Sequence, residues 1–320
     1  GLAHGTVTAV GEGLVAEVTT LREDVETFGR QANVAFTDDF RADASRRDFT
    51  INALYATLPE GGISDFFGGL DDLAARRVRF IGGPLLRIAE DHLRILRFFR
   101  FSARFAGVLD AEGLAACAIR ANDLMALSRE RIAGEMKGLL EVADPVPVLG
   151  VMLAHGILRP VLPELTADAL PVLARTIAAE TRSGVPLAWQ RRLAALLPPD
   201  PLLADTVATR LRLSNADRAR IVAAVRPLAR PLPDAAYRDG GEAVADRLLI
   251  AGDPGGEAAV MTVWQRPKLP ASGRDIIARG VAPGPQVAAR LGAFERAWVA
   301  AGFPQDPAEV AALLDRAAGA

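Results

Sequence analysis

The sequence predicts an α+β protein, with a small α/β head followed by an elongated all-helical neck, body and tail. Short runs of β-branched residues separated by glycines occupy residues 1–82, which is typical of short strands and tight turns. From Pro84 onward, apolar residues recur at helical spacing almost to the C-terminus, and prolines divide the helices. These changes of pattern predict a head at 1–82, a neck at 83–145, a body at 146–230 and a tail at 231–320.

Within the head, residues 5–22 predict a β-hairpin that turns at Gly11-Glu12-Gly13. Alternation along the second strand puts Glu17 on the same face as Val15 and Thr19, where a solvent-exposed position is one outcome. Residues 23–42 are charged and irregular and predict a loop. Residues 50–58 and 77–82 predict further short strands that close a small sheet.

The helical region has recognisable start and stop signals. Pro84 predicts the start of one long amphipathic helix over 84–106. The other signals are Asp110 and Ser128 as caps of the next two helices, Asn215 as the cap of a helix to about residue 226, and Pro285 with Gly302 around a late helix.

Composition excludes several classes of protein. A hydrophobic fraction of 50% over 320 residues is ample for a core, and the net charge of −2 gives no global basic signature of nucleic-acid binding, although it leaves room for a local arginine groove. The single cysteine, Cys117, excludes an internal disulfide and a cysteine-rich zinc site. We find no signal peptide and no run of about 18 apolar residues, so we expect a soluble, cytoplasmic protein.

The most informative segment is EDHLRILRFFR at 90–100, where Asp91, Arg94, Arg97 and Arg100 stand three residues apart. On one helix these side chains would project from neighbouring turns of one face. A carboxylate beside guanidinium groups suits a flat, anionic ligand such as a nucleotide, because Asp91 can accept from an exocyclic amine while Arg94 donates to ring acceptors. The alternative is a merely solvated face of an amphipathic helix. His92 is expected to face away from Asp91.

A second polar segment, DASRRDFTINAL at 43–54, leads to a family resemblance. The matching blocks, in order, are RRDFTINAL, GGLDDL at 68–73, VRFIGGPLLRIAEDHLRILRFFRF at 78–101, SRERIAGE at 128–135, GILRPVLPEL at 156–165 and LPASGRDIIARGVAPGPQVAARL at 269–291. Together they resemble the class II tRNA nucleotidyltransferases, which are the CCA-adding enzymes and their bacterial poly(A) polymerase relatives. Several long blocks in the right order are far more specific than one short motif.

The resemblance implies template-independent addition of C, C and A to the tRNA 3′ end, with CTP, ATP and tRNA as partners and no membrane partner. It makes the head a partial nucleotidyltransferase palm, the neck the bearer of a nucleotide-selecting helix, and the tail a tRNA contact.

The same resemblance suggests roles for individual residues. It implies that Asp91 and Arg94 choose the incoming base, that Arg47 lies on the ribose-triphosphate side, and that Arg97 and Arg100 form or support the base and phosphate pocket. Asp48 and Asn52 would orient Arg47 or touch the ribose. An ion pair of Arg47 with Asp43 or Asp48 is the structural alternative.

The start of the sequence departs from the family pattern. Family members carry a Gly-Gly element and an Asp-x-Asp pair that bind the triphosphate and two divalent ions, here expected to be Mg²⁺, whereas this sequence opens at Gly1-Leu-Ala-His-Gly. The Asp71-Asp72 pair lies in another block and is no substitute. We therefore expect a truncated nucleotidyltransferase-type head without metal ligands and with impaired catalysis, because two-metal chemistry needs carboxylates. Glu17 is a weak catalytic candidate beside the expected metal site.

Several readings stay open at this point. They are a CCA-adding enzyme, a poly(A) polymerase, an enzyme that adds only CC or only A, and a non-catalytic RNA-binding module. Gly5-Thr6-Val7-Thr8 favours the first. We expect Arg129, Arg131 and Glu135 to form pairs on the helix surface or in the neck, and Arg274-Asp275 either to meet RNA phosphates or to pair structurally.

Overall fold

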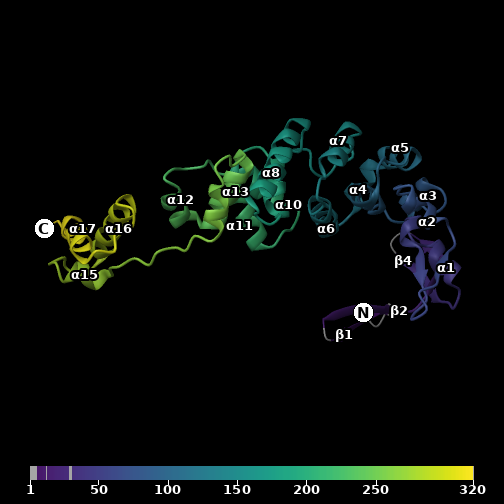
Figure 1. Cartoon of the computed structure of the whole chain (residues 1–320), viewed down its shortest axis with the longest axis horizontal. Coiled ribbons are helices and arrows are strands. Elements are labelled where there is room, and N and C mark those ends of the chain that lie inside the picture. The colour runs from purple at the N-terminus through teal and green to yellow at the C-terminus, as the bar shows by residue number, and fades with distance from the viewer. Residues whose placement is uncertain (1–5, 12, 29–30, 320) are drawn as a thin grey trace. The chain divides into compact units, whose positions relative to one another are not determined.

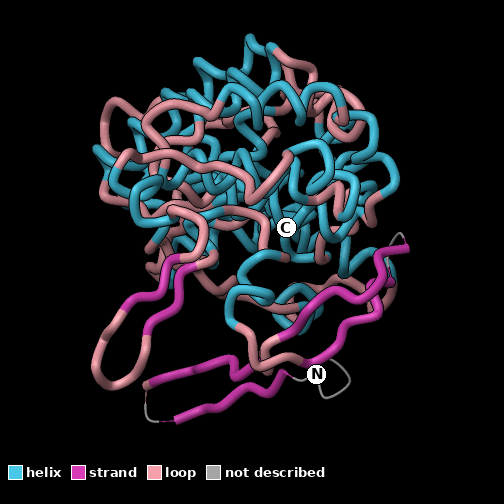
Figure 2. Tube along the Cα trace, turned by 90° about the vertical axis from the view of Figure 1, so that its right-hand side faces the viewer, coloured by secondary structure: helices cyan, strands magenta, loops and turns pink. Residues whose placement is uncertain are grey.

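The computed structural model describes residues 6–11, 13–28 and 31–319, and its elements are labelled along the chain in Figure 1. Contacts divide the chain into two units, one of residues 1–170 with 209–213 and one of residues 171–208 with 214–320. The first unit holds the described strands, drawn in magenta in Figure 2, and several helices, whereas the second unit is helical. The predicted α+β class is therefore confirmed, while the three boundaries between the four predicted domains remain predictions.

The described strands form three separate antiparallel pairs. The pairs are β1 (Thr6–Gly11) with β2 (Leu14–Thr19), β3 (Arg22–Phe28) with β4 (Gln31–Phe36), and β5 (Leu54–Ala56) with β6 (Ile63–Asp65). The predicted hairpin at 5–22 is confirmed over its described residues, and Glu17 on β2 lies opposite Thr8 on β1.

Two predictions for the head are wrong. The predicted loop at 23–42 contains the β3–β4 hairpin and the start of α1 (Phe40–Ser45), because ladder hydrogen bonds satisfy the backbone even in a charged segment. The predicted strand at 77–82 makes only an isolated bridge between Phe80 and Phe49, so it closes no sheet.

The helices of the first unit follow the strands. They are α1, the 3₁₀ helix η2 (Thr50–Asn52), α2 (Gly69–Ala74), α3 (Pro84–Glu90), α4 (Arg94–Phe105), α5 (Ala111–Ile119), η3 (Ala121–Ala126), α6 (Arg129–Leu140), α7 (Val146–Ala154) and η4 (Ala167–Ala169).

The predicted single helix over 84–106 is wrong, because α3 ends and α4 begins on either side of Asp91. Pro84 does open α3, but Asp91 is extended, with φ −149° and ψ 107°. Its Oδ1 accepts from the backbone N–H of Leu93 at 3.1 Å, and its carbonyl accepts from that of Arg94 at 3.0 Å. Short acidic side chains compete with the helix in this way. Asp91 is therefore not stacked on Arg94 along one helix.

Of the other predicted caps, most are in place. Asp110 accepts from the backbone N–H of Gly113 at 2.9 Å, and Ser128 takes the N-cap position of α6 without a side-chain cap bond. The cap predicted at Asn215 is instead Ser214, whose hydroxyl accepts from Asp217 N at 3.1 Å. An Asn-to-Ser shift of one position is typical of the uncertainty at helix ends.

An aromatic core joins the head segments around Phe49 and Phe80 to α4. Phe49, Phe80, Phe98 and Phe99 are at most 1% exposed. The Phe49 and Phe80 ring centroids lie 4.9 Å apart, and Phe80 stacks on Phe98 at 5.5 Å. Buried aromatic pairs of this kind are favourable beyond their area. The packing brings the segment at 47–52 against the helix that starts at Arg94.

The second unit is built from helices around two apolar clusters. Its helices are α8 (Leu170–Ser183), α9 (Trp189–Leu196), α10 (Pro201–Arg210), α11 (Asn215–Ala224), α12 (Leu232–Asp239), α13 (Gly241–Ala251), α14 (Glu257–Thr262), α15 (Gly273–Ile277), α16 (Pro285–Ala300) and α17 (Pro307–Ala318). One cluster centres on Val244 and Leu249, and the other on Phe294 and Trp298. The start of α16 at Pro285 matches the prediction.

Across residues 6–11, 13–28 and 31–319, helices long enough and apolar enough to cross a membrane are absent.

Candidate functional site

The first unit contains a pocket of about 430 Å³ between the segment at 47–52 and the start of α4. Its lining residues are Arg47, Asp48, Asn52, Asp91, Arg94, Arg97 and Phe101. The structure thus brings together six of the predicted site residues from three separate parts of the head and neck. Phe101 was missed, although its place one turn after Arg97 on a helix was a usable signal.

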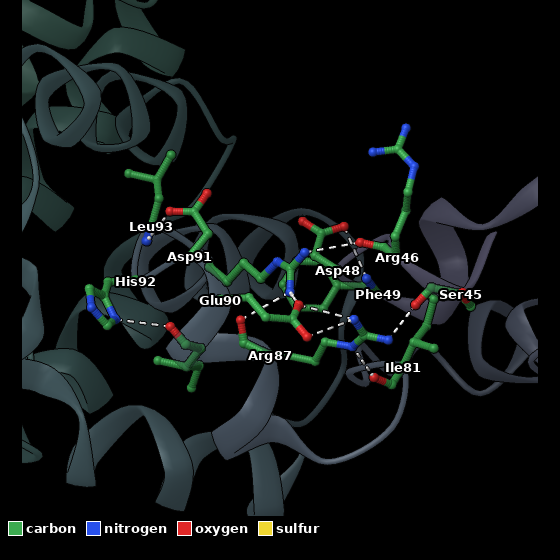
Figure 3. Close-up of polar contacts among 12 residues, drawn as sticks. Ser45, Arg46, Asp48, Phe49, Ile81, Arg87, Glu90, Asp91, His92 and Leu93 are labelled. Carbon is green, nitrogen blue, oxygen red and sulfur yellow. Dashed lines mark hydrogen bonds and ion pairs between the residues drawn. The ribbon is translucent and has the colours of Figure 1, made fainter. Parts of the chain in front are cut away.

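Asp91 presents its carboxylate to this pocket from the break between α3 and α4. Its Oδ1 accepts from Leu93 N, as Figure 3 shows. Its Oδ2 accepts from Arg131 Nη2 at 2.6 Å. Each carboxylate oxygen has two lone pairs, so both oxygens retain acceptor capacity for a ligand.

Arg94 is held on the pocket wall by fixed acceptors. Its Nη1 donates to the carbonyl of Arg87 at 3.0 Å and to the carboxylate of Glu90, and its Nη2 donates to the carbonyl of Arg46 at 3.0 Å. The side chain is only 13% exposed. These bonds use only the two Nη groups, and Arg94 is one of the residues that line the pocket.

Glu90, labelled with Arg87 in Figure 3, accepts hydrogen bonds from both Arg87 and Arg94. Arg87 Nη1 donates to both oxygens of Glu90, at 3.1 and 3.0 Å. Arg87 is itself tied to the head through the carbonyls of Ser45 and Ile81. The guanidinium of Arg94 is therefore preorganised by charge-assisted bonds, which are stronger than neutral ones.

Asp48 and Arg97 connect the two sides of the pocket. Asp48 is 7% exposed, and its Oδ2 accepts from Arg97 Nε at 2.6 Å. Its Oδ1 accepts from Asn52 Nδ2 at 2.9 Å. Arg97 also lies over the ring of Phe101, with its Cζ 5.3 Å from the centroid. The Nη1 group of Arg97 lies 3.8 Å from Glu135, and the side chain is 31% exposed.

Arg47 lines the pocket and also makes the ion pair considered as its structural alternative. Its Nη2 lies 3.1 Å from Asp43 Oδ2, its Nη1 donates to the carbonyl of Asn52 at 3.0 Å, and its Cζ lies 5.1 Å from the centroid of Tyr55. The side chain is still 41% exposed. The ion pair and a ligand-facing position therefore coexist.

Asp43 is the buried anchor of this group. Burial alone would raise its pKa, but hydrogen bonds from the Tyr55 hydroxyl, from the backbone of Arg22 and from Arg46 lower the pKa of Asp43 to about 2. Burial and the bond to Asp43 raise the pKa of Tyr55 to about 12. The carboxylate and the phenol thus keep their protonation states across the physiological range.

Arg100 does not line the pocket, in contrast to the other predicted arginines. Its Nε donates to Glu135 Oε2 at 2.6 Å, and its Cζ lies 4.5 Å from the centroid of Phe101. A Cβ on Gly138 of α6 would approach Arg100 Cδ to 2.6 Å, so this glycine leaves room for the arginine. Arg100 supports the wall behind Phe101.

Residues outside the pocket behave differently. Glu17 is exposed on β2 and does not line the pocket. His92 Nδ1 lies 2.9 Å from the carbonyl of Ile88, away from the pocket (Figure 3). Asp72 is fully buried and accepts from Thr50, Arg77 and Arg79, which is a structural role. In the tail, Asp275 forms a capping box with Ser272.

A two-ion metal centre does not fit the described residues. In the described part of the chain, groups of three or more His, Cys, Asp or Glu side chains placed to hold a metal ion are absent. The pocket carboxylates are committed to arginines and backbone N–H groups. The steps that can be assigned to these residues are binding and selection of a ligand.

Comparisons with known proteins find several proteins to which the chain is similar. Residues 1–79 match the model of the poly A polymerase head domain, and residues 109–168 match that of the probable RNA and SrmB-binding site of polymerase A. The crystal structure of the Bacillus stearothermophilus CCA-adding enzyme in complex with CTP superimposes with a TM-score of 0.74 at 27% identity, over 99% of this chain and 82% of that one.

Curated relatives match over different lengths. The zebrafish (Danio rerio) mitochondrial CCA tRNA nucleotidyltransferase 1 is 49% identical over 143 residues, which is 44% of this chain and 33% of that protein, so the match spans about a third of that relative. The CCA-adding enzyme of Lacticaseibacillus paracasei is 31% identical over 327 residues, covering 96% of this chain and 79% of the relative. On that similarity, the chain belongs to the family of CCA-adding enzymes.

Proposed function

We propose that this pocket binds CTP and ATP for the template-independent addition of C, C and A to the 3′ end of tRNA. We also propose that the described residues by themselves support this addition poorly, because carboxylates grouped to hold metal ions are absent among them. The proposal depends on one observation: Asp91, a hydrogen-bond acceptor, and Arg94, a donor, line the same pocket. The names of the relatives support the same activity.

The chemistry of the bases explains why this pair selects C and A. Both bases present an exocyclic amine next to an unprotonated ring nitrogen, so Asp91 accepts from the amine while Arg94 donates to the nitrogen. Uracil and guanine have a carbonyl in place of the amine and a ring N–H in place of the unprotonated nitrogen. The carbonyl oxygen would then face the Asp91 carboxylate, and the ring N–H would face Arg94. One good bidentate base contact discriminates by roughly 1–3 kcal/mol. Unpaired buried groups increase the rejection of the wrong base.

The remaining pocket residues suit the sugar and the phosphates. Arg47 is assigned to the ribose-triphosphate side, since its guanidinium is anchored at Asp43 yet still exposed. Arg97 is assigned to the base and phosphate region. Asp48 was expected to orient Arg47 but is bonded to Arg97, whereas Asn52 accepts from Arg47 through its carbonyl, so we assign Asp48 to orienting Arg97, Asn52 to orienting Arg47, and either of them to the ribose. Arg100 acts as support through Phe101 and Glu135.

Nucleotidyl transfer in such enzymes uses divalent ions, and Mg²⁺ is the ion we propose. A pair of such ions would stabilise the attacking and leaving oxygens, but carboxylates grouped to hold them are absent from the described residues, so no step is assigned to the ions here. Glu17 supplies one carboxylate at most, so the contribution derived for these residues is to bind the nucleotide, orient its base and reject other bases.

The test is incubation with tRNA that lacks its terminal CCA, with labelled CTP or ATP and Mg²⁺, read by product length. Growth that stops after C, C and A supports the proposed product, and incorporation near background is the result expected if the described residues alone must hold the metal ions. A long tail of A alone would favour the poly(A) polymerase reading, which the name of the head-domain match raises. Nucleotide binding is measured in parallel by calorimetry, and failure to bind CTP or ATP more tightly than UTP or GTP would overturn the assignment of the pocket.

A further inference from the structure

Helix α6 contacts the pocket from behind with two side chains one turn apart. Arg131 Nη2 donates to Asp91 Oδ2 at 2.6 Å. Glu135, four residues later, accepts from Arg100 Nε at 2.6 Å and lies 3.8 Å from Arg97 Nη1. Residues four apart share a helix face, so α6 presents a cation to the pocket's acid and an acid to its arginines.

The contact of Arg131 with Asp91 is expected to orient the Asp91 carboxylate more than it stabilises the fold. The two side chains are 43% and 35% exposed, and exposed ion pairs contribute little to folding stability. Its geometry, however, is short and charge-assisted. Arg131 is not among the residues that line the pocket, and it meets the lining through its bond to Asp91.

The two bonds to Asp91 define the plane of its carboxylate. Leu93 N holds Oδ1 at 3.1 Å from the chain just before α4, and Arg131 holds Oδ2 from α6. A carboxylate held by one bond can rotate about its last torsion, whereas bonds to both oxygens restrict that rotation. Base selection depends on where the lone pairs of Asp91 point.

We propose that Arg131 is a positioning residue that determines base specificity by holding the Asp91 carboxylate in register with the exocyclic amine of the incoming nucleotide. This inference rests on the proposed function of the pocket. It assigns to α6 a part in selecting the nucleotide, although no α6 side chain lines the pocket.

The test measures the ratio of dissociation constants for UTP and CTP by calorimetry, with the whole chain and its variants, so it does not require turnover. We expect Arg131→Ala to lower this ratio about fivefold, and Arg131→Lys to retain more of it because lysine keeps the charge but not the fork. The unfolding midpoint should shift by no more than about 2 °C. Arg212→Ala is the matched control, since Arg212 pairs at 2.7 Å with exposed Glu130 of the same helix.

A double-mutant cycle with Asp91→Ala tests whether Arg131 acts through Asp91. If it does, adding Arg131→Ala to Asp91→Ala leaves the ratio unchanged. A further fall in that background, or an unchanged ratio in the single Arg131→Ala variant, would overturn the inference. A ratio that Asp91→Ala itself does not lower would instead refute the proposed function, so the two failures are distinguishable.

Discussion

Asp48 and Arg97 lie 49 positions apart in the sequence and share a hydrogen bond of 2.6 Å between Oδ2 and Nε. Each directly precedes a buried phenylalanine, Phe49 and Phe98, whose ring centroids are 6.3 Å apart. The aromatic core thereby aligns the polar residues next to it. The apolar packing of the head against α4 and the construction of the pocket are one arrangement.

Removal of Arg97 should be costly for both folding and binding. Arg97→Ala leaves the Asp48 carboxylate, which is 7% exposed, without its charged donor. We expect a loss of about 1–3 kcal/mol in the free energy of unfolding, measured by denaturant titration, together with weaker CTP binding. Arg104→Ala on the same helix is the control, because Arg104 is exposed and stacks only on Phe105 among the contacts described. Equal losses in the two variants would contradict a special role for the Asp48–Arg97 bond.

Asp91→Ala should impair selection of CTP and ATP, because loss of one base contact removes roughly 1–3 kcal/mol of discrimination between bases. The tRNA affinity should stay within about twofold of the unsubstituted protein, because no tRNA contact is assigned to Asp91. Calorimetry with CTP and UTP and a tRNA gel-shift titration measure the two quantities. Asp71→Ala, an exposed carboxylate in α2, should change neither. A parallel loss of tRNA affinity in Asp91→Ala would refute the assignment of this residue to the base.

Glu90→Gln should loosen Arg94 without removing it. The substitution keeps a neutral acceptor near Arg94 Nη1 but removes the charge that also binds Arg87 at 3.0 Å. Since charge-assisted bonds are about twice as strong as neutral ones, we expect CTP affinity to fall about three- to tenfold. Glu112→Gln in the exposed first turn of α5 serves as the control. An affinity equal to that of the unsubstituted protein would mean that Arg94 is held adequately by the carbonyls of Arg46 and Arg87.

Asp43 should make stability depend on pH in the acid range. The pKa of Asp43 is lowered from 3.8 to about 2 in the folded state. The carboxylate therefore adds to the free energy of unfolding at pH values above its pKa in the unfolded chain, and this addition is lost as the pH falls from about 4 toward 2. A shift of this size corresponds to about 2 kcal/mol at neutral pH.

Asp43→Asn has no carboxylate to titrate and therefore tests this linkage. We expect its deficit in unfolding free energy to be largest near pH 7 and to narrow below about pH 4, as measured by urea titrations at several pH values. A deficit that stays constant from neutral to acid pH would show that the loss comes from packing rather than from ionisation. Nucleotide affinity should also fall, because Arg47 loses the anchor at 3.1 Å.

The sequence by itself determined the class of fold, the family and the residues that gather at the pocket. Periodicity and proline placement identified the helical region, and long ordered blocks around Arg47 and Asp91 identified the family. These features depend on residues close together in the sequence, so they can be recognised without knowing which distant residues are in contact. Six of the predicted residues line one pocket for that reason.

Only the tertiary structure decided how those residues are held. The sequence pattern treated 84–106 as one helix, whereas side-chain and backbone bonds at Asp91 interrupt it. It left open whether Arg100 lines the pocket or supports it, and in the structure Arg100 is bonded to Glu135 of α6 and lies over the ring of Phe101. The bonds from Arg131 to Asp91 and from Arg97 to Asp48 join residues 40 and 49 positions apart. Spacing along a chain cannot specify such pairs, because they depend on how the helices pack on the aromatic core.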